Sequence, residues 1–166
     1  MRSVSKFLAL GVLLAAVTPV QAQMTYTATG GNALIPDVLA SVDLPDGNTL
    51  ARTITHGFTW TNEENIVGGN GSLECYGSNT LSPEGDQLDG SGTCEALDAD
   101  GDIWWIWWSG GTEGNFGFTG GTGKYTGISG GGTWKAQLQY PDGKASNEWE
   151  GTWTIPAHAT AEPGVE

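Results

Sequence analysis

The chain has 166 residues, with six Lys and Arg against 19 Asp and Glu and a formal net charge of −13 at pH 7. Nucleic-acid binding is nearly excluded, because phosphate recognition needs clustered basic side chains. The 27 glycines follow no period and stand between aromatic and β-branched residues, which excludes collagen and argues against disorder.

The first 22 residues have the pattern of a secretory signal peptide. Arg2 and Lys6 give a positive start, a short apolar stretch follows, and Val20-Gln21-Ala22 fits the small-residue cleavage site. This stretch is too short to span a bilayer, and no later segment is long and apolar enough to do so. We therefore predict an exported protein, periplasmic or secreted, without a membrane span. Its parts are a signal peptide at 1–22, one domain at 23–156 and a flexible tail at 157–166.

Short segments of strand character follow one another through the mature chain. A first strand is predicted at 24–29, and the irregular apolar segment 32–40 is expected to form a short turn of helix. Further strands are predicted at 51–60, 69–76, 91–97, 103–108, 116–118, 135–140 and 149–155. Asp-Gly and Gly-rich turns separate them. The pattern predicts an all-β fold, and glycines at the corners favour a single antiparallel barrel of roughly eight strands over a sandwich.

The segment 103–108, Ile-Trp-Trp-Ile-Trp-Trp, is apolar on both faces of its predicted strand. Side chains alternate along a strand, so Trp104 and Trp108 share one face and Trp105 and Trp107 share the other. One face would line the interior, while the other would need cover from a second element, a subunit or a ligand.

The two cysteines, Cys75 and Cys94, are predicted to form a disulfide. They are the only cysteines in a chain with a secretory leader, and extracellular compartments are oxidising. A catalytic thiol is the alternative, but no histidine lies nearby in the sequence to activate it.

Three segments resemble the allene oxide cyclase-like β-barrel superfamily, in its small exported bacterial branch. They are Leu44-Pro45-Asp46-Gly47, the run 92–102 and the Gly-rich run 120–132, GGTGKYTGISGGG. The resemblance covers roughly residues 43–153 and implies an eight-stranded barrel with an apolar lumen, related to dirigent proteins. It also implies lipophilic ligands and assembly as a dimer or trimer. It assigns no catalytic residue, and a fold alone does not determine a reaction.

His56 is the first candidate for chemistry, because alternation places it beside Ile54, Phe58 and Trp60. If that face lines the lumen, His56 is positioned for proton transfer near neutral pH, and Glu74 is its candidate partner. The alternative is a half-buried structural histidine. The aromatic residues predicted to contact a ligand are Phe58, Trp60, Trp105, Trp107, Trp134 and Trp153, because aromatic walls suit flat or long apolar molecules.

Two further motifs have simpler interpretations. Asp98, Asp100 and Asp102 alternate as calcium ligands do, but the downstream bidentate Glu is missing and Asp-Gly favours a hairpin turn. We predict a turn and no metal ligands, with calcium as the alternative. The run Gly120–Lys124 lacks the spacing of a phosphate-binding loop.

The sequence therefore favours an exported barrel that binds a lipophilic or aromatic small molecule in its lumen without a cofactor. Cyclase- or isomerase-like activity is compatible with this hypothesis. The alternative is a non-catalytic envelope or surface protein whose exposed tryptophans serve self-association or carbohydrate stacking.

Overall fold

The computed structural model describes residues 22–157. Residues 1–21 of the predicted signal peptide lie outside the described residues, and so do residues 158–166 of the predicted tail. The strands are β1 (Gln23–Asp43), β2 (Thr49–Thr61), β3 (Gly71–Leu81), β4 (Gln87–Leu97), β5 (Ile103–Gly110), β6 (Glu113–Gly121), β7 (Ser129–Gln139) and β8 (Ala145–Pro156). One 3₁₀ turn, η1 (Gly123–Tyr125), lies between β6 and β7.

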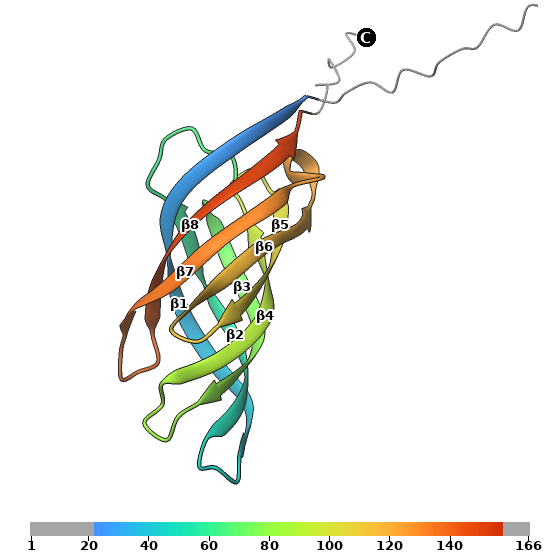
Figure 1. Ribbon diagram of the computed structural model, residues 1–166. Coiled ribbons are helices and arrows are strands. Elements are labelled where there is room, and N and C mark those ends of the chain that lie inside the picture. The colour runs from blue at the N-terminus through green and yellow to red at the C-terminus, as the bar shows by residue number, and fades with distance from the viewer. Residues whose placement is uncertain (1–21, 158–166) are drawn as a thin grey trace, which may run out of the picture.

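The eight strands form a closed antiparallel barrel (Figure 1). Each strand pairs with its neighbours in sequence, and β1 closes the barrel by pairing with β8. The predicted Asp-Gly turns follow β1, β4 and β7, where Gly47, Gly101 and Gly143 have φ of 89°, 91° and 85°. Glycine adopts this left-handed region without steric cost. The prediction of an eight-stranded barrel is confirmed.

The expectation of helix at residues 32–40 is wrong, because this segment belongs to the 21-residue strand β1. Its irregular alternation reflects a change of register between Val38 and Ala40 in the pairing with β2. Pairing with β8 ends at Leu34, so Pro36 lies where β1 has a neighbour on one side only. Proline is tolerated there because no ladder hydrogen bond from its nitrogen is required.

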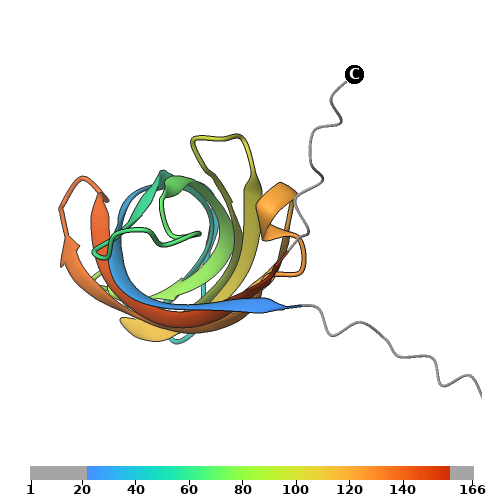
Figure 2. The ribbon, with the colours of Figure 1, turned by 90° about the horizontal axis from the view of Figure 1, so that it is seen from above.

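The β2–β3 loop crosses one end of the barrel in the view from above (Figure 2), and it packs against the side chains of Trp149 and Trp153, which close this end. Trp153, 1% exposed, donates a hydrogen bond from Nε1 to the carbonyl of Val67 in this loop at 2.9 Å. Beyond the pair Gly117 and Gly131, β6 and β7 separate, and η1 follows β6 there with Tyr125 buried against Trp104. The hairpin turns of β1–β2, β3–β4, β5–β6 and β7–β8 surround the opposite end (Figure 1).

Within residues 22–157, no helix has the length and apolar character needed to cross a membrane.

Candidate ligand-binding lumen

The barrel encloses a cavity of about 440 Å³. Its lining runs from Gly69 and Trp153 at the closed end to Leu81, Gln87 and Leu138 at the end formed by the hairpin turns. This volume lies within the range of small-molecule sites in proteins. We call this cavity the lumen and the hairpin end its mouth.

Aromatic side chains from β5–β8 form one wall of the lumen. They are Trp104, Trp108, Phe116, Phe118, Trp134, Trp149 and Trp153. Several meet edge to face, with ring centroids 6.4 Å apart for Trp108 and Trp134 and 6.3 Å apart for Phe116 and Trp149. This geometry is preferred because the positive edge of one ring meets the negative face of another.

The wall formed by β1–β3 combines apolar residues, such as Leu34 and Leu73, with small, uncharged polar side chains. Thr53, Thr55 and Thr59 face inward from β2, and Asn32 and Asn79 face inward from β1 and β3. Asn32 Nδ2 donates to Asn147 Oδ1 at 2.7 Å, and Asn79 Nδ2 donates to Thr53 Oγ1 at 3.0 Å. These short side chains leave room opposite the tryptophans.

The predicted disulfide joins Cys75 and Cys94, which are direct partners on β3 and β4. Both residues are buried and line the lumen, with Cα atoms 4.0 Å apart and an S–S distance of 2.03 Å. The prediction is confirmed, and the bridge holds two neighbouring strands together inside the barrel.

Asp86, in the β3–β4 turn, is the only ionisable side chain among the described residues that line the lumen. An isolated charge in an apolar cavity is unfavourable, so a lumen of this composition favours an uncharged ligand.

His56 and Glu74 lie on the outer surface of the barrel, so the expectation that His56 lines an apolar cavity is wrong. Their side chains are 48% and 37% exposed, and His56 Nδ1 lies 3.3 Å from Glu74 Oε2. Tyr76 donates a hydrogen bond to Glu74 Oε1, which raises the pKa of the tyrosine hydroxyl. The structure brings the two predicted residues together, but on the wrong face for proton transfer in the lumen. The inward face of β2 carries Thr53, Thr55 and Thr59, across the lumen from the aromatic wall.

Of the six aromatic residues predicted to contact a ligand, Trp134 and Trp153 line the lumen. The other four, Phe58, Trp60, Trp105 and Trp107, are 37–58% exposed on the outer surface, so their expected place in the lumen is wrong. With Tyr76, 49% exposed, these four residues form what we call the outer aromatic face.

Local packing explains part of the outer aromatic face. The rings of Phe58 and Trp60 lie 6.1 Å apart. A Cβ at Gly117 would lie 2.5 Å from Trp107 Nε1, so the indole covers the glycine on the neighbouring strand. Tyr76 and Trp107 are both register partners of Thr93. The outer aromatic face therefore consists of a pair on β2 and a group on β3 and β5 on either side of Thr93 of β4, and His56 and Glu74 lie in register between the two.

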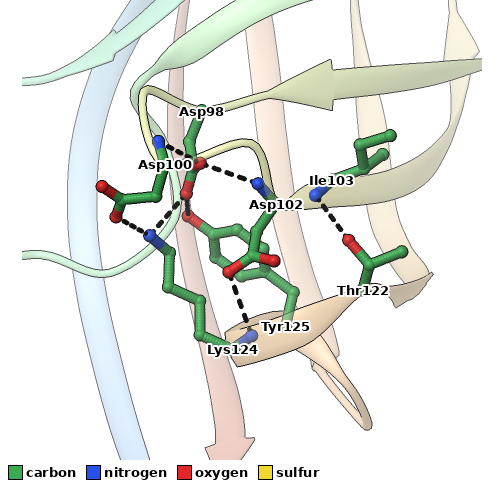
Figure 3. A network of polar contacts seen from close by, with 7 residues as sticks. All are labelled: Asp98, Asp100, Asp102, Ile103, Thr122, Lys124 and Tyr125. Atoms are coloured by element: carbon green, nitrogen blue, oxygen red, sulfur yellow. Dashed lines mark hydrogen bonds and ion pairs between the residues drawn. The ribbon is translucent and has the colours of Figure 1, made fainter.

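The Asp98–Asp102 turn is held by a lysine and a tyrosine (Figure 3). Lys124 Nζ lies 2.6 Å from Asp98 Oδ2 and 2.5 Å from Asp100 Oδ2, and Tyr125 OH donates to Asp98 Oδ2 at 2.9 Å. The backbone N–H groups of Asp100 and Asp102 donate to Asp98 Oδ1. Burial opposes ionisation of Asp98, but these hydrogen bonds outweigh it and lower its pKa to about 2.

These contacts make the turn a clip between the β4–β5 hairpin and η1. Burial and the hydrogen bond to Asp98 raise the pKa of the Tyr125 hydroxyl, so it remains a donor. Within the part of the chain that the structure describes, no group of three or more His, Cys, Asp or Glu side chains is arranged to hold a metal ion.

Sequence reasoning missed the threonine and asparagine side chains of the lumen. Alternation in residues 51–60 separates two faces, and the apolar face was assigned to the interior. The pairing of Thr55 with Cys75 is the signal that identifies the inward face, since the disulfide lies inside.

Among solved structures, a pterocarpan synthase dirigent protein is similar in fold, with a TM-score of 0.54 and 14% sequence identity over 86% of this chain and 99% of that chain. The chain has a dirigent-like barrel fold. No protein-family model matches the sequence, and a search of curated proteins found no match. At this identity the likeness concerns the fold alone.

Proposed function

We propose that the protein binds an uncharged lipophilic or aromatic small molecule in its lumen. The observation that carries this proposal is an aromatic-walled cavity of about 440 Å³ in which Asp86, at the mouth, is the only ionisable lining residue described. Apolar cavities with a few uncharged polar groups are typical of small-molecule sites. The dirigent-like fold supports the same proposal.

Native mass spectrometry of protein purified from its own host, with a lumen-filling variant beside it, tests the proposal. Thr55→Phe adds a ring on the inward face of β2, and Thr133→Phe adds the same ring at an exposed position of β7 as a matched control. We expect a retained mass on the wild type and on Thr133→Phe, and its loss from Thr55→Phe. A retained mass on all three proteins, or an absence of any retained or added apolar ligand on the wild type, would contradict the proposal.

The finer form of this proposal is a cyclase- or isomerase-like conversion. Such a reaction would proceed by holding one reactive conformer and excluding water, because His56 and Glu74 lie outside the lumen. Chromatography of the recovered ligand before and after incubation with the protein measures this conversion. Turnover that Thr55→Phe abolishes and Thr133→Phe preserves is the expected result, whereas recovery of unchanged ligand identifies a binder.

Export and family placement remain part of the proposal. A disulfide inside the barrel suits an oxidising compartment. The Gly-rich run 120–132 supports placement with the small exported bacterial allene oxide cyclase-like proteins within the dirigent-like fold.

The outer aromatic face supports a second candidate function, which is self-association or carbohydrate stacking on the barrel surface. Exposed apolar patches of this kind mark interaction sites in soluble proteins. Light scattering with and without neutral oligosaccharides distinguishes the two uses. A monomer that binds none of these sugars would contradict this candidate.

A further inference from the structure

Asn79 has an unpaired carboxamide oxygen on the wall of the lumen. The residue is 7% exposed, and its Nδ2 is occupied by the hydrogen bond to Thr53. Its Oδ1 is buried and has no hydrogen-bond partner among the described residues. Leaving a buried carbonyl oxygen unpaired is unfavourable, so this atom favours a ligand that donates a hydrogen bond.

The space over Gly90 explains where this oxygen lies. A Cβ at Gly90 would be 2.4 Å from Asn79 Oδ1 and 3.2 Å from Gln87 Nε2, so the two side-chain amides occupy the place of a side chain at residue 90. Gln87 Nε2 donates to the carbonyl of Gly110 at 3.1 Å. Gln87 begins β4 at the mouth, so this group of side-chain amides lies toward the open end of the lumen.

Trp134 supplies the complementary group on the other wall. Its ring lines the lumen and meets Trp108 edge to face. Its Nε1 is buried without a hydrogen-bond partner in the described part of the chain. An indole N–H is a donor only, so it favours a ligand that carries an acceptor.

The strands that carry these two groups are connected in register through glycines. Asn79 pairs with Gly90, and Trp134 pairs with Gly114, which pairs with Gly110. Gly90 and Gly110 continue the β4–β5 register by one residue. The aromatic wall of the lumen, which includes Trp108 and Trp134, offers ring faces against which a flat molecule can stack.

We propose that the lumen selects an uncharged ring compound with a hydrogen-bond donor at one end, for Asn79 Oδ1, and an acceptor at the other, for Trp134 Nε1. This inference rests on the function proposed above and names two specificity-determining residues for it. The uncharged lining supports the same choice, because Asp86, in the turn at the mouth, is the only ionisable lining residue described.

Three probes of similar size test the inference by isothermal titration calorimetry on the wild type and two variants. They are 6-methoxy-2-naphthol, with donor and acceptor, 2-methoxynaphthalene, with an acceptor only, and 2-methylnaphthalene, with neither. Asn79→Leu removes the carboxamide, and Trp134→Phe keeps a ring but removes the N–H. A net hydrogen bond corresponds to about a threefold to tenfold change in affinity.

We expect Asn79→Leu to weaken only the naphthol by that factor and Trp134→Phe to weaken both methoxy probes. Binding of 2-methylnaphthalene should change by no more than about twofold, which also shows that the lumen is folded and open. Gly90→Ala provides a second variant if Asn79→Leu does not fold, because its methyl group displaces the Asn79 carboxamide while keeping the residue. It should weaken the naphthol selectively.

Equal losses for all three probes, or no loss for any, would overturn this inference while leaving lumen binding intact. If none of the probes binds the wild-type protein, the proposed function fails together with the inference.

Discussion

Replacing Asp98 by Asn is expected to lower the free energy of unfolding by about 2 kcal/mol at pH 7. The Asp98 side chain is 8% exposed and accepts hydrogen bonds from Lys124, Tyr125 and two backbone N–H groups. These bonds favour the carboxylate in the folded state. The variant removes the negative charge that holds the β4–β5 hairpin to η1.

The magnitude follows from the pKa of Asp98, which is about 2 in the folded protein against its ordinary value of 3.8. At about 1.4 kcal/mol per pKa unit, this difference corresponds to about 2 kcal/mol. A carboxyl group with a lowered folded-state pKa stabilises the fold fully above its unfolded pKa. That contribution disappears as the pH falls through the folded-state pKa, to below about 0.5 kcal/mol at pH 2.

Urea denaturation followed by tryptophan fluorescence, at several values between pH 7 and pH 2, measures the difference between wild type and Asp98→Asn. Asp100→Asn is the matched control, because Asp100 contacts the same Lys124 but its side chain is 77% exposed. Exposed ion pairs contribute little, so this control should differ from the wild type by less than about 0.5 kcal/mol. The reasoning is refuted if Asp98→Asn is as stable as Asp100→Asn at pH 7, or if its deficit does not shrink toward pH 2.

Reduction of the Cys75–Cys94 disulfide should lower the free energy of unfolding by about 3 kcal/mol, because the bridge closes a 19-residue separation. Thiol titration of the denatured, unreduced protein should find no free thiol, and two free thiols would contradict the bridge. Trp107→Ser should lower the mass measured by light scattering if the outer aromatic face self-associates. Trp108→Ser should instead weaken ligand uptake and lower the free energy of unfolding by about 3 kcal/mol. Identical behaviour of the two variants would argue against separate roles for the inner and outer faces of β5. His56→Gln should leave lumen affinity within about tenfold, measured by calorimetry with 2-methylnaphthalene, and a larger loss would connect the outer surface to the lumen.

Local sequence patterns predicted most of the strands and turns. Asp-Gly pairs marked three hairpins, alternation identified β2 and β8, and the run of isoleucine and tryptophan identified β5. The disulfide was predictable because two cysteines allow one intramolecular pairing. Residues 32–40 were mispredicted because a change of register disrupts the two-residue period that identifies a strand.

The clip between Asp98 and Lys124 was not predictable from spacing. The two residues lie on different connections of the barrel, and each has a plausible local role in a turn. Their contact exists only because β5 and β6 pair and bring the ends of both hairpins together.

The sequence by itself determined that β2 and β5 have two distinct faces, but only the tertiary structure decided which face of each strand lines the lumen. Alternation is the same for either choice. The inward face of each strand is decided by how all eight strands close around one interior, and in this barrel the threonines of β2 lie across the lumen from the aromatic residues of β5–β8. This requirement to share one interior acts between residues far apart in sequence, and it therefore placed His56 outside and Asn79 and Trp134 inside.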